Sequence, residues 1–127
     1  MSKRKEFFSV IKRIQSFKYA FSGIFHLLKN EHNAWIHVLA AIIAIAGGIL
    51  LDINWVEWLF VLGTICLVFS LELINTSIER LCDTVTLDNN VHIKQAKDLA
   101  AGAVLMAAFF AIIVAGVIFY NHWEEIF

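Results

Sequence analysis

The residues of this chain that could do chemistry together lie at helical spacing within one stretch, residues 70–83. They are three carboxyl groups and a carboxamide, from Glu72, Asn75, Glu79 and Asp83. At about 100° per residue on an α-helix, these four side chains fall within roughly 80° of one another, on a single face. Aligned oxygen-bearing groups of this kind can bind a cation or accept a proton. This face is therefore the first candidate for a functional site.

The position of Glu72 strengthens this interpretation. An apolar run, residues 59–69, leads into it and is long enough only for a membrane or a deep core. An ionisable group at such depth is costly unless it faces protein, water or a cation, so it is a functional candidate by default. The alternative is a solvated polar stripe at a helix end. That alternative suits Glu79 and Asp83, but apolar residues flank Glu72 on both sides.

The composition is that of a membrane protein. Of 127 residues, 60% are hydrophobic, only 17% are charged and none is proline, and the mean hydropathy is +0.74. These values exclude an ordinary small soluble domain and favour an all-α polytopic membrane protein. We expect a single membrane domain over residues 1–127 and no nucleic-acid partner. The spacing of Cys66 and Cys82 indicates neither a disulfide framework nor a metal motif.

The N-terminal segment predicts an amphipathic helix over about residues 3–28. Its apolar side chains recur at intervals of three or four residues: Phe7, Ile11, Ile14, Phe17, Phe21 and Ile24. Lysines and arginines flank this stripe, a pattern typical of a helix that lies in the membrane interface. The competing interpretation is a helix packed against a soluble core. We favour the surface helix, because the chain has no room for a separate soluble core.

Three further helices, each with an apolar stretch that predicts a membrane span, are expected over about 34–51, 55–83 and 94–120. The first has one polar group near its entry, His37, for which an interfacial position or a hydrogen bond to a neighbouring helix is the expected role. Gly47 and Gly48, near its end, indicate either a close helix contact or a frayed terminus. The last is rich in alanine and glycine, which lets helices approach closely.

The distribution of lysine and arginine predicts the orientation. All ten lie in the N-terminal segment or between residues 80 and 97, and none lies in the turn at 52–54 or after Tyr120. The positive-inside rule therefore predicts a cytoplasmic N-terminus and a cytoplasmic 80–97 region, with the C-terminus outside. The polar face of residues 72–83 then ends at the inner membrane surface, where ATP and lipid head groups are both accessible.

Carboxylates, a carboxamide and lysines at one interface suit phosphoryl transfer from a nucleotide. Carboxylates hold Mg²⁺ against substrate phosphates, a lysine neutralises charge on the transferred group, and a buried carboxylate can take the proton of an attacking hydroxyl. The chain has no Walker motif and no glycine-rich loop. The residues alone leave two possibilities open: an interfacial metal-assisted transferase, or an ion or proton pathway. The end of the stripe in cytoplasmic water, beside lysines, favours the first.

The same residues resemble a known family. The resemblance rests on Glu72-Leu-Ile-Asn75-Thr-Ser-Ile-Glu79, then Asp83, then Ala96-Lys97-Asp98 before a small-residue helix, with Lys18-Tyr19-Ala-Phe-Ser-Gly23 and Asn30-Glu31 upstream. This arrangement is similar to that of the bacterial integral-membrane diacylglycerol kinases, which include the undecaprenol kinases of Gram-positive bacteria, and it covers nearly the whole chain. The resemblance implies three transmembrane helices and a surface helix, a homotrimer with shared active sites, and a multi-pass protein of the bacterial cytoplasmic (inner) membrane.

The activity implied by the resemblance is transfer of the γ-phosphate of ATP to a lipid primary alcohol, with Mg²⁺. Glu72 then resembles the general base that deprotonates the lipid hydroxyl, and Glu31 and Glu79 resemble the carboxylates that bind the metal together with ATP. Asn75 and Asp83 resemble polar supports of the site.

The remaining implied contacts concern the nucleotide. Lys97 and Asp98 resemble groups that contact its phosphates and ribose, and Asp88, Asn89 and Asn90 match the nucleotide-contacting loop. Lys12 and Tyr19 resemble surface-helix residues near nucleotide or lipid.

Several of these residues also have a purely structural interpretation. Glu31 could be the N-cap of the first span, and Asn75 could bridge helices. Lys97 and Asp98 could form an ordinary solvated helix start, and Tyr19 could be only an interface anchor.

The acceptor lipid stays open between diacylglycerol and undecaprenol. The segment after Asp98 reads Leu-Ala-Ala-Gly, where diacylglycerol-specific members carry a serine, and residues 88–90 replace a tyrosine and a histidine. The Leu-Ala-Ala-Gly-Ala-Val-Leu form, together with the Glu31-His32-Asn33 entry, is more similar to the undecaprenol branch.

A second class of function, a non-enzymatic oligomeric channel or transporter subunit with Glu72 as an ion or proton site, predicts polar residues through the full depth of the membrane. Between Glu57 and Ser70 the chain offers only Thr64 and Cys66. This one-sided polarity favours a site at the membrane interface.

Overall fold

The structure, a computed structural model, describes residues 8–127, and within this range it contains helices and no strand. The helices are α1 (Val10–Asn30), α2 (His32–Leu50), α3 (Trp55–Val85), α4 (Val91–Asn121) and the short α5 (Trp123–Ile126). Three of them, α2, α3 and α4, are long and apolar enough to cross a membrane. The expected all-α class, with three spans and an N-terminal helix, is confirmed.

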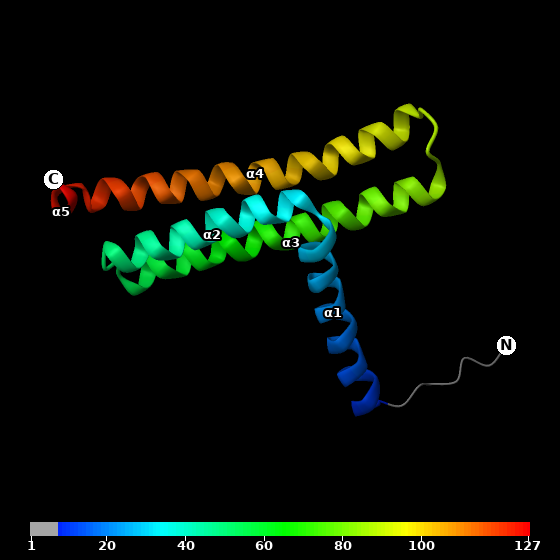
Figure 1. Cartoon of the computed structure of the whole chain (residues 1–127), viewed down its shortest axis with the longest axis horizontal. Helices are drawn as coiled ribbons and strands as arrows, with labels where there is room; N and C mark the ends of the chain where they lie inside the picture. The colour runs from blue at the N-terminus through cyan, green and yellow to red at the C-terminus, as the bar shows by residue number, and fades with distance from the viewer. Residues whose placement is uncertain (1–7) are drawn as a thin grey trace.

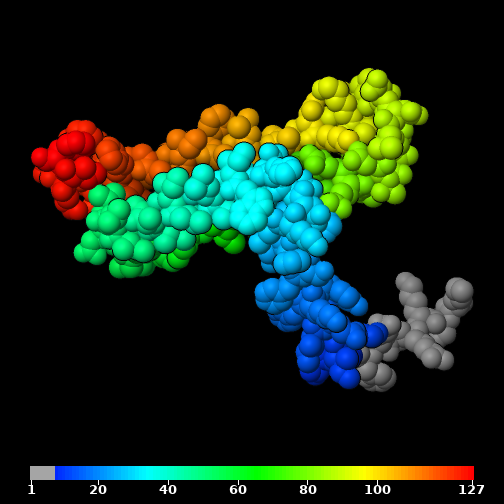
Figure 2. Space-filling view, in the orientation of Figure 1, coloured from blue at the N-terminus to red at the C-terminus, as the bar shows by residue number. Residues whose placement is uncertain are grey.

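The three long helices lie roughly side by side, and α1 leaves them at a steep angle (Figure 1). The α2–α3 turn and the C-terminus lie together at one end, which we call the turn end (residues 50–58 and 118–127). The α3–α4 connection lies at the other, which we call the loop end (residues 79–98). Figure 2 shows most of α1 standing clear of the other helices. Its C-terminal end packs against α2 and α3, where Leu27 is its one buried residue.

Side-chain caps set where these helices begin. Asn54 Oδ1 accepts from the backbone N–H of Glu57 at 3.0 Å, and Glu57 Oε2 accepts from the N–H of Asn54 at 3.1 Å, which forms a capping box at the start of α3. Asn90 Oδ1 accepts from two backbone N–H groups at the start of α4. This cap explains why α4 begins at Val91, three residues before the predicted start at 94.

The start of the N-terminal helix corrects its predicted boundary. α1 begins at Val10, because Ser9 caps it by accepting from the N–H of Lys12 at 3.3 Å. The predicted helix began at about residue 3, and residues 3–7 lie outside the part that the structure describes. Glu31 occupies the N-cap position of α2, but its side chain makes no capping hydrogen bond.

The buried core lies at the turn end. Ile53, Val61, Val114 and Ile118 pack together there, between α3, α4 and the turn. Gly48 of α2 lies against Trp58, where an added Cβ would come within 2.8 Å of the indole. A Cβ at Gly47 would meet nothing within 4 Å. The close-contact interpretation of the two glycines is therefore correct for Gly48 alone.

Candidate functional site

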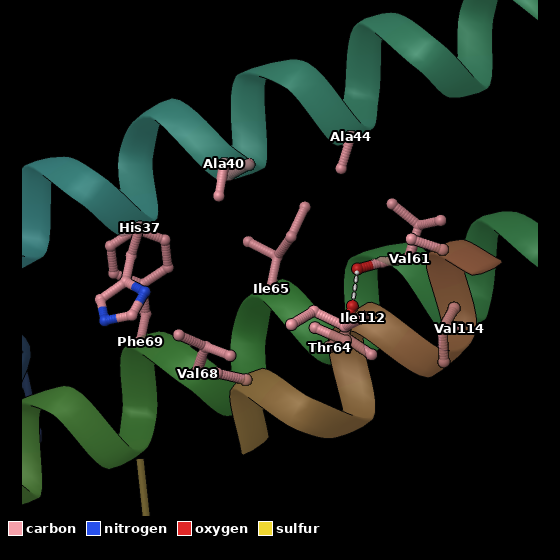
Figure 3. Close-up of a pocket in the computed structure, with 14 residues that line it drawn as sticks. His37, Ala40, Ala44, Val61, Thr64, Ile65, Val68, Phe69, Ile112 and Val114 are labelled. Carbon is pink, nitrogen blue, oxygen red and sulfur yellow. Dashed lines mark hydrogen bonds between the residues drawn. The ribbon is translucent and has the colours of Figure 1, made fainter. Parts of the chain in front are cut away.

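Glu72 lies within α3, and only 3% of its surface is exposed. Its Oε2 is 3.6 Å from Nε2 of His37, which reaches across from α2. The His37 ring stands edge-on to Phe69, with ring centroids 6.3 Å apart. Figure 3 shows these two rings together at one end of a cavity. A carboxyl group is thus held inside the helix bundle.

The polar groups that follow Glu72 on α3 are incompletely paired. Asn75 Nδ2 donates to Glu79 Oε1 at 3.4 Å, so these two predicted site residues are in contact. Within residues 8–127, the buried side-chain atoms without a hydrogen-bond partner are Asn75 Oδ1 and Thr76 Oγ1. A buried acceptor without a partner is costly and rare in native proteins. These atoms are therefore candidates for contact with a ligand.

Glu31, at the junction of α1 and α2, joins this region from a second element. Its Oε1 is 3.5 Å from Nη2 of Arg80, one turn beyond Thr76 on α3. Glu31 therefore lies beside the part of α3 that carries Glu79 and Arg80, with Arg80 as its neighbouring cation.

The predicted nucleotide residues surround a pocket of about 520 Å³ at the loop end. Its lining includes four of them, Asp88, Asn89, Asn90 and Lys97, together with Asp83, a predicted polar support of the site. Lys97 Nζ donates to Asp83 Oδ1 at 2.6 Å, which ties α4 to the end of α3. Asn90 also serves as the α4 cap, so its side-chain oxygen is engaged by the backbone.

Three predicted site residues, Lys12, Tyr19 and Asp98, neither line the loop-end pocket nor take part in the contacts around Glu72. Asp98 does not line the loop-end pocket and accepts from Lys94 at 2.6 Å. Lys12 and Tyr19 lie on α1, which diverges from the bundle (Figure 1), and Tyr19 is 70% exposed.

Sequence reasoning missed two contacting residues, His37 and Arg80, and gave a third, Lys94, no role of its own. Lys94 was expected at the inner membrane surface with Lys97 and the 88–90 loop, and it lines the loop-end pocket. Its three-residue spacing from Lys97 places both lysines on one helix face. His37 stood out in the sequence as the one polar group of its apolar run, but nothing in the sequence predicted that its partner is Glu72. No spacing pointed to the pairing of Arg80 with Glu31.

No group of three or more His, Cys, Asp or Glu side chains able to hold a metal ion occurs among residues 8–127. Mg²⁺ demands less of the protein, because it keeps several waters and uses one or two carboxylates plus substrate phosphates. Glu31 and Glu79, with the unpartnered Asn75 Oδ1 beside Glu79, are the kind of oxygen donors that suit an ion delivered with a nucleotide. The donor set therefore fits Mg²⁺ bound together with ATP.

An apolar cavity of about 300 Å³ extends from His37 along α3 towards the turn end. Small side chains from α2 and α4, including Ala40, Ala44, Ala108 and Ala111, form much of its wall. Figure 3 shows Ala40 and Ala44 facing Ile65 and Val68 across it. The alanine-rich wall of α4 leaves room there for a slender hydrocarbon chain.

A second histidine–glutamate pair lies at the turn end. His122 Nε2 is 3.0 Å from Glu57 Oε2, and His122 Nδ1 is 3.1 Å from Glu125 Oε2. Both ring nitrogens can donate only when the imidazole is protonated. The hydrogen bonds to Glu57 and then to Glu125 therefore raise the pKa of His122 above its usual value.

Comparison with known proteins indicates the family. The family model described as prokaryotic diacylglycerol kinase matches residues 18–119. The chain is 37% identical over 105 residues to an undecaprenol kinase of Bacillus subtilis (strain 168). The matched residues cover 83% of this chain and 85% of that protein. It is 39% identical over 103 residues to a diacylglycerol kinase of Synechocystis sp., covering 80% of this chain and 58% of that protein. A diacylglycerol kinase of Escherichia coli (strain K12) is 24% identical over 110 residues, 87% of this chain and 90% of that protein.

Proposed function

The chain belongs to the prokaryotic diacylglycerol kinase family, and from that premise we propose that it transfers the γ-phosphate of ATP to the primary hydroxyl of a membrane lipid, undecaprenol or diacylglycerol. The observation that carries the assignment of the site is the continuous polar face of α3. It joins the buried carboxyl of Glu72 to the pocket at the loop end through Asn75, Glu79 and Asp83. The comparisons give no support to a channel or transporter subunit.

In the proposed reaction, Glu72 is the general base. Its carboxylate takes the proton of the lipid hydroxyl as that oxygen forms a bond to the γ-phosphorus, and the bond from phosphorus to the leaving oxygen of ADP breaks. Burial at 3% exposure keeps water away from the base and thus disfavours hydrolysis of ATP. His37 contacts the carboxylate of Glu72, and Asn75 follows one turn further along the same face of α3.

The loop-end pocket is proposed to bind the polyphosphate and the ribose. Lys97 and Lys94 supply positive charge beside it, and Asp83 fixes Lys97 through the 2.6 Å hydrogen bond. The backbone and side chains of residues 88–90 supply polar contacts. Asp98, Lys12 and Tyr19 stay proposed nucleotide contacts, and they lie farther from this pocket in one subunit.

Glu31 and Glu79 are the proposed ligands of Mg²⁺. The ion neutralises charge on the phosphates when it binds with ATP. Glu31 is within ion-pair distance of Arg80, so the cation that balances it in the described part of the chain is a guanidinium.

The apolar cavity is the proposed position of the acceptor's hydrocarbon chain. His37 belongs to its wall and also contacts Glu72. A chain in the cavity would therefore bring the acceptor hydroxyl at its polar end to the base. That hydroxyl is the glycerol hydroxyl in diacylglycerol and the terminal hydroxyl in a polyprenol.

We also propose a homotrimer with a cytoplasmic N-terminus. The divergence of α1 supports the first, because a helix that leaves its own bundle can approach the site of a neighbouring subunit (Figure 2). The grouping of all lysines and arginines in residues 3–29 and 80–97 supports the second.

The test is phosphate transfer from labelled ATP with Mg²⁺ by the purified protein in mixed micelles. Dioleoylglycerol and a short polyprenol are offered in parallel, with Glu72→Gln as the inactive variant and Glu57→Gln as a matched control on the same helix. Label in either lipid, lost only with Glu72→Gln, would support the proposal and name the acceptor. No label in either lipid from a folded protein would overturn it.

A further inference from the structure

His37 occupies an unusual position for a histidine. It lies inside the apolar helix α2, where it is the one polar group between residues 34 and 51, and its side chain is only 19% exposed. Burying an imidazole among apolar side chains is unfavourable unless a partner compensates for the lost hydration. Phe69 packs against the ring but offers no hydrogen bond, so the compensating group is Glu72.

The contact is made through one defined atom. Nε2 faces Glu72 Oε2 at 3.6 Å, which is longer than a hydrogen bond and within the range of an ion pair. Contacts of this kind are often long before substrate binds and shorten in the reacting complex. Among residues 8–127, no other cation or imidazole is paired with Glu72.

This contact can fix the orientation of the Glu72 carboxylate, which a base needs in order to meet its substrate. A carboxylate that rotates freely presents either oxygen, in any orientation, to its substrate. An N–H aimed at Oε2 fixes the plane of the carboxylate and leaves Oε1 for the acceptor hydroxyl. Bases in other active sites are oriented by a third group in the same manner.

The site itself adds a second reason for such a group. Glu79 follows Glu72 on the same face of α3, and ionised carboxylates such as Glu79 and Glu31 accept hydrogen bonds but donate none. Arg80 is engaged with Glu31 at 3.5 Å. The imidazole N–H of His37 is the donor that the described part of the chain brings to the carboxylate of Glu72.

We propose that His37 is a positioning residue for the catalytic base: its Nε2–H holds the Glu72 carboxylate oriented towards the acceptor hydroxyl at the mouth of the apolar cavity. The inference rests on the proposed function, because it assigns His37 a role only if Glu72 is the base. His37 itself transfers no proton to substrate in this scheme.

The experiment uses three substitutions at one position in the full-length protein. His37→Gln places an amide nitrogen close to the position of Nε2, His37→Asn places it close to Nδ1, and His37→Leu keeps the bulk without a donor. We expect kcat to fall about 10- to 100-fold with Leu and with Asn, since a hydrogen bond to a charged group is lost. With Gln we expect a kcat within about threefold of wild type. KM for Mg·ATP should stay the same in all three.

His122→Leu is the matched control, because it removes the other histidine that contacts a glutamate, at the opposite end of the bundle. We expect it to retain the wild-type kcat. In a Glu72→Gln background, His37→Leu should cause no further loss, since the two residues act as a unit.

The outcomes separate the two proposals. Wild-type kcat in His37→Leu, or equal losses in Gln, Asn and Leu, would overturn the positioning role while leaving the kinase and its base in place. An inactive wild-type protein, or a fully active Glu72→Gln variant, would instead overturn the proposed base, and the inference would fall with it. Comparing Gln with Asn keeps the test decisive even where Leu does not fold.

Discussion

The two ends of the helix bundle each bring a histidine against a glutamate of α3, and the two pairs are built differently. At the turn end, Glu57 closes a helix cap and contacts His122 at 3.0 Å. Both nitrogens of that histidine have carboxylate partners. Towards the loop end, His37 and Glu72 stand 3.6 Å apart, next to two buried polar atoms that lack partners within residues 8–127.

The difference indicates what each pair is for. A network whose polar atoms are all engaged fixes the ends of two helices and leaves nothing for a ligand to contact. A buried network with open acceptors is less stable by itself and is kept where a ligand completes it. A buried apolar cluster also lies at the turn end, whereas the buried polar atoms without partners among the described residues, Asn75 Oδ1 and Thr76 Oγ1, lie nearer the loop end.

The largest expected effect separates the two glutamates. Glu72→Gln should lower kcat about 100- to 10,000-fold, because it removes the proton acceptor, while the protein stays folded and keeps its oligomeric state. Glu57→Gln should keep its activity. Initial rates of lipid phosphorylation, with size-exclusion profiles of both variants, check this. Loss of assembly in Glu72→Gln would return that residue to a structural role.

The next effect concerns the loop end alone. Lys97→Met should weaken productive ATP binding about 10- to 100-fold, as expected for the loss of a charge-assisted hydrogen bond. Lys94→Met should have a smaller effect, because Lys94 is more exposed and pairs with Asp98 of its own helix. KM for ATP in both variants is the measurement. A larger increase in KM for Lys94→Met than for Lys97→Met would indicate that the nucleotide does not bind on the Asp83–Lys97 side of the pocket.

A smaller effect is expected at the turn end. Gly48→Ala should destabilise the protein by about 1–3 kcal/mol, because the added Cβ would meet the Trp58 ring at 2.8 Å. Gly47→Ala has open space around it and is the control. Thermal unfolding in detergent compares the two variants, and specific activity below the transition should be unchanged in both. Equal unfolding midpoints would mean that the ring moves aside at little cost.

The smallest expected effect is a pH dependence of the turn end. The raised pKa of His122 means that its carboxylate contacts stabilise the fold fully below about pH 6.5. This contribution is lost as the pH rises through the raised folded pKa. Unfolding midpoints of wild type and His122→Gln, measured from about pH 6 to about pH 9, should therefore converge at the alkaline end. A constant difference across this range would contradict the protonated pair.

Much of the fold was readable from the sequence because length and hydropathy determine membrane spans. The three apolar stretches predicted α2, α3 and α4 with ends within three residues of those observed. The boundary errors come from caps: Asn90 begins α4 early, and Ser9 begins α1 later than its apolar stripe suggested. The short α5 lay beyond any hydropathy signal.

The site was readable only in part. Spacing along one helix brought Glu72, Asn75, Glu79 and Asp83 to one face, and the structure adds the contact between Asn75 and Glu79. Contacts between helices were not readable. Pairing His37 with Glu72, or Arg80 with Glu31, depends on how each helix is rotated about its axis. A helix that is apolar all round leaves that rotation undetermined by hydropathy, because lipid and protein neighbours are equally apolar.

Because α3 is one unbroken helix, it fixes the distance between Glu57 and Glu72. Glu57 and Glu72 are joined by unbroken helix, which at a rise of about 1.5 Å per residue separates them by about 22 Å. The hydrocarbon core of a bilayer is about 30 Å thick. A helix that crosses the membrane upright with Glu57 at one face would place Glu72 about 8 Å below the opposite face. If Glu72 is the base, as proposed, the thickness of the host bilayer would set how deep the acceptor alcohol must lie to react, and turnover would then depend on the composition of the surrounding lipid.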